Sequence, residues 1–375
     1  MLFSSTIIRA VAAGLKRKDF PLVVDPVCVA QSGDALLEDK AVDAMVEHIF
    51  PLADLLTPNI PEAEMFAAMA VKGPEDVEEA ATRLLDMGPR AVLLKGGHFD
   101  SVTSTDWYCA KGQKPIPFIQ PRVKTKNNHG TGCTLSAAIA THLGRGLRMS
   151  QAVRAAQAYL NLGLRASFAV GAGNGPVNHS VPLIKAQAAP GVLEELAEAA
   201  WELAAIPGLG ALLPLRRANM ALALPYAVDE GEVAAFSGGL ARQGGRAFAA
   251  GRPAFAASTL AARAVLAARK AAGGLSCGVV LSGEDSVVRA LGAEPAAFSA
   301  EDRPRSVDEA PASVMDWGVG KALESADAAA AQAGASVLAR GFEGGPLLVL
   351  LAADAPALLA RLRELAAAAA GSDAR

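Results

Sequence analysis

Short apolar runs alternate with longer amphipathic stretches in the first half of the chain. The apolar runs, bounded by charged residues, glycine or proline, predict buried strands at 21–25, 53–57 and 91–95. Apolar residues at helical spacing predict helices at 7–15, 40–50, 62–70, 74–87, 131–143 and 150–168. This alternation predicts a mostly parallel sheet covered by helices on both faces. Two further runs, 105–110 and 116–119, flank a turn and predict a hairpin on that sheet.

A second α/β pattern begins beyond residue 218. Its predicted strands and helices lie at 220–224, 255–272, 277–281, 319–333 and 347–351. Between the two patterns, 192–205 predicts a helix bounded by Pro190-Gly191 and Pro207-Gly208. We therefore expect a first domain at 1–185, a helical connector at 186–212, and a second, smaller α/β domain at 213–371.

Composition narrows the class of protein. Hydrophobic residues make up 52% of the 375 residues and charged residues 19%, which favours a sizeable core over disorder. A net charge of -3 gives no electrostatic reason to expect a nucleic-acid partner. No apolar run reaches the roughly 18 residues of a membrane helix, so no membrane partner is expected. The 4 cysteines show no CxxC or zinc spacing, which favours a reducing cytoplasm.

Polar residues cluster at the carboxyl ends of the predicted strands. Asp25-Pro26, Thr57-Pro58-Asn59 and Lys95-Gly96-Gly97 each follow an apolar run directly. In open α/β sheets, ligands bind beyond the carboxyl ends of the strands. This placement predicts a ligand site at that edge of the sheet.

A glycine-rich segment leads directly into the helix predicted at 131–143. In Asn127-Asn128-His129-Gly130-Thr131-Gly132-Cys133-Thr134, two glycines allow several backbone N–H groups to converge where the helix dipole is positive. Such an anion hole suits a phosphoryl group in transfer. Cys133 lies at the helix start, which favours the thiolate form. The same residues are equally compatible with a loop that caps a buried helix beside an inert cysteine.

The segment His129-Gly130-Thr131-Gly132-Cys133-Thr134 resembles the signature of hydroxymethylpyrimidine/phosphomethylpyrimidine kinases of the ribokinase superfamily. Four more segments match that family in the same order: Val24-Asp25-Pro26-Val27 with Ser32-Gly33, Thr57-Pro58-Asn59-Ile60-Pro61-Glu62-Ala63, Leu94-Lys95-Gly96-Gly97-His98 and Gly175-Pro176-Val177-Asn178-His179. The resemblance implies a ribokinase-like three-layer α/β/α sandwich. It also implies ATP-dependent phosphorylation of hydroxymethylpyrimidine and its monophosphate in thiamine biosynthesis.

The same resemblance assigns the chemistry to the glycine-rich segment. Cys133 is expected to deprotonate the substrate hydroxyl, in the place of the aspartate base of sugar kinases, and Gly130, Thr131 and Gly132 are expected to surround the transferring phosphoryl group. Val27, together with Cys133, is expected to bind the pyrimidine substrate.

The resemblance places the nucleotide and its metal at the strand ends. Asp25, Asn59, Glu62 and Lys95 are expected to bind ATP, with Asp25 and Glu62 as the residues that hold Mg²⁺. Carboxylate oxygens suit this hard cation, which usually retains several waters. From the residues alone, Asp25 could also form an Asp-Pro turn, Glu62 could be a glutamate favoured at a helix start, and Lys95 could be a solvated lysine at a strand end.

The beginning of the sequence departs from the family. Family members start with a strand and a glycine-rich segment that precede the part matched here, and the resemblance therefore implies that the first strands of the sandwich are lacking. Such a sheet would expose edges and apolar surface. We expect residues 1–375, purified alone, to be unstable or inactive.

From Val192 onward the chain resembles a thiamine-phosphate synthase domain, with softer motifs. Leu260 stands where that family has a histidine, while Arg246, Arg263 and Arg340 remain as candidate phosphate ligands. Three alternatives stay open: an active synthase domain, a non-catalytic thiamine-phosphate-binding regulatory protein, and a pyridoxine-type kinase. A small-molecule substrate is expected in each case, and homodimer formation is left open.

Overall fold

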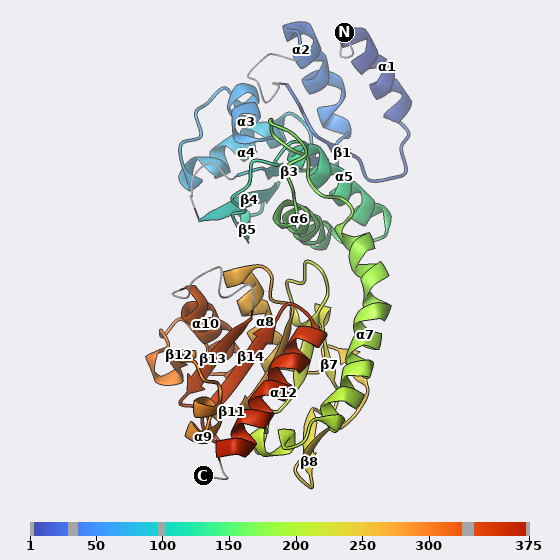
Figure 1. Cartoon of the computed structure of the whole chain (residues 1–375). Coiled ribbons are helices and arrows are strands. Elements are labelled where there is room, and N and C mark those ends of the chain that lie inside the picture. Colours follow the sequence, from blue (N-terminus) through green and yellow to red (C-terminus); the bar gives the residue numbers. More distant parts are fainter. Residues whose placement is uncertain (1–3, 29–36, 97–101, 325–333, 373–375) are drawn as a thin grey trace. The chain divides into compact units, whose positions relative to one another are not determined.

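The computed structural model describes residues 4–28, 37–96, 102–324 and 334–372. The chain divides into two compact units, Met1–Val181 and Pro182–Arg375 (Figure 1). Both units are mixed α/β, as the alternating sequence pattern predicts.

A five-stranded sheet in the order β1-β2-β3-β4-β5 forms the centre of the first unit. Its strands are β1 (Val23–Val24), β2 (Leu55–Leu56), β3 (Ala91–Leu94), β4 (Thr103–Ala110) and β5 (Ile116–Pro121). The first three run parallel, whereas β4 and β5 form an antiparallel hairpin that joins the sheet beside β3. The predicted parallel strands and hairpin are therefore confirmed.

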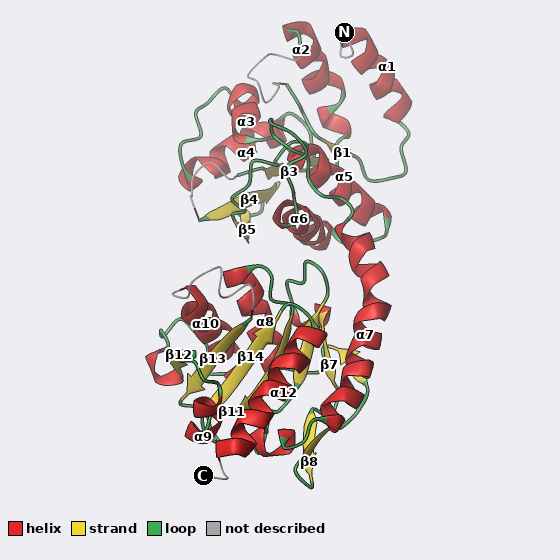
Figure 2. Cartoon of the chain, viewed as in Figure 1, coloured by secondary structure: helices red, strands yellow, loops and turns green. Residues whose placement is uncertain are grey.

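Helices cover both faces of this sheet (Figure 2). They are α1 (Ser5–Leu15), α2 (Asp39–His48), α3 (Ile60–Ala67), α4 (Val77–Asp86), α5 (Thr131–Gly144) and α6 (Met149–Arg165), with 3-10 turns η1 (Phe50–Leu52) and η2 (Pro74–Asp76). Alternate strand residues face opposite sides, so Leu56 and Leu94 pack with α1–α4, whereas Leu55 and Leu93 pack with α5 and α6. The predicted three-layer α/β/α arrangement is confirmed.

The second unit contains a seven-stranded sheet in the order β10-β7-β6-β11-β14-β13-β12, and a separate hairpin. The sheet strands are β6 (Met220–Ala223), β7 (Val233–Phe236), β10 (Pro253–Phe255), β11 (Cys277–Ser282), β12 (Ala296–Ser299), β13 (Ala335–Arg340) and β14 (Leu347–Ala352); the hairpin is β8 (Leu240–Gln243) with β9 (Arg246–Ala249). Every sheet pairing is antiparallel except β12 with β13.

Helices again lie on both faces of the second sheet. They are α7 (Val181–Ala205), α8 (Thr259–Ala272), α9 (Asp285–Ala290), α10 (Pro311–Glu324) and α12 (Ala355–Ser372), with 3-10 turns η3 (Leu209–Leu212), η4 (Glu230–Glu232) and η5 (Ala300–Asp302). One apolar cluster joins the sheet to α7, α9 and α12, and the other joins it to α8 and α10. The predicted second α/β domain is therefore present.

Helix α7 departs from the sequence prediction. It begins at Val181 rather than 192, and it continues through Pro190. Proline in a helix interior costs about 3 kcal/mol. Leu196 and Leu203 are fully buried in the core of the second unit, and each such burial contributes about 1.5–3 kcal/mol, which outweighs that cost. The predicted connector therefore belongs to the second compact unit, Pro182–Arg375.

Two other predicted helices have different starts. Helix α8 begins at Thr259 rather than 255, because Pro253–Phe255 pairs with β7 as strand β10. Helix α10 begins at Pro311 rather than 319, and residues 325–333 of that prediction lie outside the described residues. Within the described ranges, no helix combines the length and apolar character needed to cross a membrane.

Candidate active site

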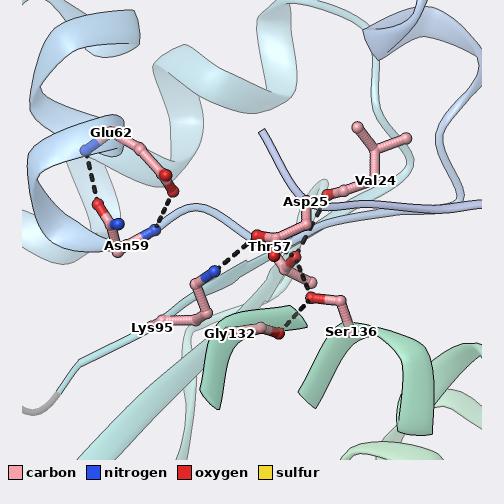
Figure 3. A network of polar contacts seen from close by, with 8 residues as sticks. All are labelled: Val24, Asp25, Thr57, Asn59, Glu62, Lys95, Gly132 and Ser136. Atoms are coloured by element: carbon pink, nitrogen blue, oxygen red, sulfur yellow. Dashed lines mark hydrogen bonds and ion pairs between the residues drawn. The ribbon is translucent and has the colours of Figure 1, made fainter. Parts of the chain in front are cut away.

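Three strand ends bring the predicted polar residues together at one edge of the first sheet (Figure 3). Asp25 follows β1, Asn59 follows β2 and Lys95 follows β3. Because these strands are parallel and adjacent, their carboxyl ends lie side by side. Asn59 and Lys95 form a parallel bridge, in which the Lys95 N–H donates to the Pro58 oxygen at 2.8 Å.

An ion pair lies at the centre of this edge. Lys95 Nζ is 2.6 Å from Asp25 Oδ1, and the two side chains are 13% and 14% exposed. A Cβ atom added to Gly132 would lie 3.1 Å from Lys95 Nζ and 3.6 Å from Asp25 Oδ2. The missing side chain at Gly132 therefore lets the first turn of α5 approach the ion pair closely.

The glycine-rich segment opens α5 as the sequence predicts. Gly130 precedes the helix with φ of +79°, a left-handed conformation that glycine adopts without steric penalty. Thr131, Gly132 and Cys133 are the first three residues of the helix, and first-turn amides have no acceptor within a helix. This first turn lies at the positive end of the helix dipole, and Gly132 within it lies next to Lys95, while the Thr131 N–H donates to the Asn128 oxygen at 3.4 Å.

Solvent access separates Cys133 from the other cysteines. Cys133 is exposed, whereas Cys28, Cys109 and Cys277 are buried. Burial raises the pKa of Cys28 and of Cys109 to about 12, and it raises the pKa of Cys277 well above its ordinary value. Cys133 is therefore the cysteine that a substrate can reach.

Asn59 and Glu62 form a reciprocal cap at the start of α3. Asn59 Oδ1 accepts the Glu62 N–H at 2.8 Å, and Glu62 Oε2 accepts the Asn59 N–H at 2.8 Å. Glu62 is only 3% exposed. Burial raises the pKa of Glu62, and the charge of Asp25 adds to this, against the bond from Asn59 and the charge of Lys95.

Two hydroxyl groups link the ion pair to α5, and sequence reasoning missed one of them, Ser136. Thr57 Oγ1 lies 3.3 Å from Asp25 Oδ1 and 2.9 Å from Ser136 Oγ, and Ser136 Oγ lies 3.1 Å from the Gly132 oxygen (Figure 3). Both residues are buried. The Thr-Pro-Asn motif pointed to Thr57, but Ser136 becomes its partner only through the packing of α5 on the sheet.

We expect Thr57→Val to lower the free energy of unfolding by about 1–2 kcal/mol, because the Ser136 hydroxyl loses a buried partner. Urea unfolding measures the change. Thr57→Ser keeps the hydroxyl and should lose less stability. If Thr57→Val and Ser136→Ala add independently in the double variant, the two hydroxyl groups are not coupled.

The remaining predicted residues lie partly outside the described ranges. Val27 follows Asp25 in a turn in which the Val27 N–H donates to the Asp25 oxygen at 2.9 Å. Its side chain is 38% exposed, so it is accessible beside Asp25. Ser32-Gly33 and Gly97-His98, which belong to the matched motifs, fall outside the described residues.

A cavity of about 250 Å³ lies beside the loop that leads into α5. Its wall comes from β4, β5, the loop after β5 and α6, and includes Asp106, Arg122, Thr125, Asn128, Gln157 and Leu160. The wall therefore combines apolar surface with several hydrogen-bonding groups, which is typical of small-molecule sites.

Asp106 connects this cavity to the Lys95 strand end. Its Oδ1 accepts the Gly96 N–H at 3.0 Å, and its Oδ2 accepts Gln157 Nε2 at 2.6 Å. Burial raises the pKa of Asp106, against these two hydrogen bonds and the charge of Lys95. A signal was present in the sequence, because Gln157 interrupts the otherwise apolar buried face of α6.

Two protein families match separate parts of the chain. Residues 1–178 match the family described as phosphomethylpyrimidine kinase, and residues 195–364 match the one described as thiamine-phosphate synthase ThiN. A hydroxymethylpyrimidine/phosphomethylpyrimidine kinase of Synechococcus elongatus is 37% identical over 187 residues, which cover 49% of this chain and 70% of that protein. The chain belongs to the hydroxymethylpyrimidine/phosphomethylpyrimidine kinase family.

Other members of the family extend beyond the matched region. The thiamine biosynthesis bifunctional protein ThiED of Geobacter sulfurreducens is 44% identical over 48% of this chain and 36% of its own length. A Rhizobium meliloti kinase of the same family is 44% identical over 46% of this chain and 65% of its own length. The chain thus spans less than two thirds of each of these two relatives.

Solved structures with similarity to the chain include two small-molecule kinases. An ADP complex of Bacillus subtilis pyridoxal kinase shares 28% identity with a TM-score of 0.44, covering 49% of this chain and 69% of that one. A phosphomethylpyrimidine kinase from Clostridium difficile shares 33% identity with a TM-score of 0.37, covering 43% and 65%.

Proposed function

We propose that the first unit transfers the γ-phosphoryl group of ATP to the hydroxyl of hydroxymethylpyrimidine, and then to the resulting monophosphate. The family relatives named as kinases of both compounds support this activity. One observation carries the proposal. The exposed Cys133 lies in the first turn of α5, where Gly132 meets the partly buried Lys95–Asp25 pair.

Cys133 and its neighbours have separate roles in the transfer. The Cys133 thiolate takes the proton of the substrate alcohol as the alcohol oxygen bonds to phosphorus, and the bond to the ADP oxygen breaks. The amides of Thr131, Gly132 and Cys133 hold the charge that builds on the phosphoryl oxygens. Val27, exposed beside Asp25, contacts the pyrimidine.

The carboxylates at the strand ends fit a magnesium ion. Within the described residues, no group of three or more acidic, histidine or cysteine side chains is placed to hold a metal. Mg²⁺ is usually held by one or two carboxylates together with substrate phosphates, and it neutralises their charge. Asp25 and Glu62 fit this pattern. Burial and the negative charge of Asp25 both raise the pKa of the Glu62 carboxyl, and a bound cation would favour its charged form.

The raised pKa of Glu62 predicts a pH dependence. The folded state holds the Glu62 proton more tightly than the unfolded state, so the stability contributed by this group falls as pH rises from the ordinary value of 4.5 through the raised pKa. We expect Mg²⁺ to raise the melting temperature more at about pH 8 than at about pH 5, because the cation favours the charged form. Scanning calorimetry with and without Mg²⁺ measures this.

Two glutamates of α3 provide a matched comparison for the magnesium effect. Glu62→Gln retains an acceptor for the Asn59 N–H but removes the charge, and it should abolish the pH dependence of the Mg²⁺ shift. Glu64→Gln alters a glutamate that accepts the Val71 N–H at 2.8 Å, and it should leave the shift unchanged. Equal behaviour of both variants would exclude Glu62 as a magnesium residue.

The cavity beside α6 supplies a place for the nucleotide base. It adjoins Asn128, in the loop that opens α5, and Asp106 ties it to Gly96. A nucleotide whose phosphates lie at Lys95 and Gly132 can extend its base in this direction. Leu160 offers apolar contact to a flat ring, and Gln157 and Thr125 offer hydrogen bonds.

A transfer assay tests the proposed function. Residues 1–375 are incubated with ATP, Mg²⁺ and hydroxymethylpyrimidine, alone and preceded by the N-terminal segment of the Rhizobium meliloti relative, and phosphorus NMR follows the products. We expect the monophosphate and the diphosphate of hydroxymethylpyrimidine to form only when ATP is present, in the extended chain. Phosphorylation of pyridoxine but not of hydroxymethylpyrimidine would favour the pyridoxine-type alternative. Nucleotide binding with neither product would contradict the kinase.

For the second unit we propose thiamine-phosphate binding without synthase activity. Leu260, in the place of the family's histidine, is 8% exposed and packs in the apolar core, so no proton donor stands there. Arg263 is paired with Glu230 through Nε, which leaves Arg246 and Arg340 as the exposed candidates for phosphate. Calorimetry with thiamine phosphate tests binding. Formation of thiamine phosphate from its two phosphorylated precursors would contradict the proposal.

A further inference from the structure

Two buried hydroxyl groups form a chain that ends on the backbone of the first turn of α5 (Figure 3). Thr57 Oγ1 lies 2.9 Å from Ser136 Oγ, and Ser136 Oγ lies 3.1 Å from the Gly132 oxygen. Thr57 is fully buried, and Ser136 is 7% exposed. Because Thr57 follows strand β2 and Ser136 lies in α5, the chain ties this turn to the strand ends that carry the Lys95–Asp25 pair.

The distances decide the direction of these hydrogen bonds. Each hydroxyl has one proton to donate. Thr57 Oγ1 is also 3.3 Å from Asp25 Oδ1 and 3.3 Å from the Val24 oxygen, both beyond the usual O–H···O range of about 2.5–3.0 Å. Donation from Thr57 to Ser136 leaves the Ser136 proton for the Gly132 oxygen at 3.1 Å, whereas the reverse direction would leave the Thr57 proton to the oxygens at 3.3 Å. The shorter set favours Thr57 as the donor to Ser136, and Ser136 as the donor to Gly132.

The Gly132 oxygen and the Cys133 N–H are the two ends of one peptide group. A hydrogen bond donated to the oxygen draws electron density from the nitrogen and makes the N–H a stronger donor, because hydrogen bonds in a chain polarise one another. Cys133 is the third residue of α5, and first-turn amides have no acceptor within a helix. The N-cap, Gly130, has no side chain that could accept such an amide. Neither the helix nor its cap therefore takes up the Cys133 N–H, which can donate to a phosphoryl oxygen.

We propose that Ser136 is a positioning residue for phosphoryl transfer: held by Thr57, its hydroxyl donates to the Gly132 oxygen and strengthens the Cys133 N–H as a donor to the transferring phosphoryl group. This inference rests on the proposed function, in which that amide holds the charge that builds on the phosphoryl oxygens. Ser136 is buried and acts through the peptide group rather than on a substrate. A stronger donor gains most where its acceptor gains charge, so the effect should appear in the rate of transfer rather than in substrate affinity.

Ser136→Ala tests this role. Transfer from ATP to hydroxymethylpyrimidine is measured in residues 1–375 preceded by the N-terminal segment of the Rhizobium meliloti relative. We expect kcat to fall about 2- to 8-fold with both KM values unchanged, since polarisation strengthens a donor by roughly 10–30% and a whole donor contributes about 10²- to 10³-fold. An unchanged kcat, with an active wild-type chain, would overturn this inference alone. No transfer in the wild-type chain would overturn the proposed function as well.

Three variants separate polarisation from a general loss of packing. Ser136→Thr keeps a hydroxyl that can reach the carbonyl four residues back, and it should restore kcat. Ser136→Cys keeps similar bulk with a weak S–H donor, and it should be slow even if Ser136→Ala does not fold. Thr141→Ala removes the same kind of bond, from Thr141 Oγ1 to the Ala137 oxygen at 2.8 Å, at an exposed position of α5, and it should keep the wild-type rate. Equally slow transfer in Ser136→Thr and Ser136→Ala would point to packing and overturn the inference.

Two further measurements test the hydrogen-bond chain itself. Thr57→Val leaves the Ser136 proton directed at Gly132, so it should slow transfer less than Ser136→Ala does; a larger loss would contradict the assigned direction. The amide nitrogen chemical shift of Cys133 reports hydrogen bonding to the Gly132 oxygen, because both atoms belong to one peptide group. In protein made with nitrogen-labelled cysteine, we expect Ser136→Ala to move this signal upfield and Thr141→Ala to leave it in place. A signal that ignores Ser136→Ala would overturn the polarisation.

Discussion

Replacing Cys133 by alanine should slow phosphoryl transfer by about 10²- to 10⁴-fold, the usual contribution of a general base, with little change in ATP affinity. The thiol is exposed at the start of α5, one residue from the glycine that meets Lys95 and Asp25. Its loss removes the proton acceptor but leaves the backbone amides and the ion pair in place. Single-turnover transfer from labelled ATP to hydroxymethylpyrimidine, in the chain extended by the relative's N-terminal segment, measures the effect.

Variants of two other cysteines, and aspartate in place of Cys133, serve as controls for this experiment. Cys28→Ala and Cys109→Ala change buried thiols whose pKa is raised to about 12, so neither should slow transfer to the same degree. Cys133→Asp supplies an alternative base and should recover part of the rate, with a pH profile displaced to lower pH. Full activity of Cys133→Ala would remove the cysteine from the mechanism.

Replacing Lys95 by methionine is expected to give the second large effect. The variant removes the cation next to Gly132 and leaves the partly buried Asp25 near Glu62 without its cationic partner. We expect transfer to fall by about 10²- to 10³-fold, as for other groups that stabilise transition-state charge. Removing one side of this partly buried ion pair should also lower the free energy of unfolding by about 1–3 kcal/mol. Urea unfolding and single-turnover kinetics separate the two effects.

A second lysine in the same unit allows these effects to be distinguished. Lys18 Nζ lies 2.5 Å from Asp54 Oδ2, and the side chains are 15% and 14% exposed, nearly the burial of the Lys95–Asp25 pair. Because Asp54 keeps Arg90 Nη1 at 3.0 Å and the Leu22 N–H at 2.8 Å, Lys18→Met should cost less stability than Lys95→Met, and it should leave transfer unchanged in the folded fraction. A similar loss of transfer in both variants would mean that Lys95 acts only through stability.

The sequence by itself predicted where the candidate site residues gather. The apolar runs ending at Asp25, Thr57 and Lys95 predicted parallel strands, and parallel neighbours necessarily bring their carboxyl ends to one edge. The glycines at 130 and 132 predicted the start of α5, because the backbone conformation and close approach there exclude a side chain. These are local constraints, and local constraints are visible in sequence.

Contacts between distant segments were decided only by the tertiary structure. Ser136 meets Thr57, and Gln157 meets Asp106, across 79 and 51 residues of sequence. The sequence marks Thr57 by its motif and Gln157 as a polar residue on an apolar face, but it does not give their partners, since each pairing depends on how a helix packs on the sheet. Helix α7 runs through Pro190 for the same reason, because burial of Leu196 and Leu203 outweighs a local preference. Local backbone preferences are encoded residue by residue, whereas the partner of a buried polar group is set by packing.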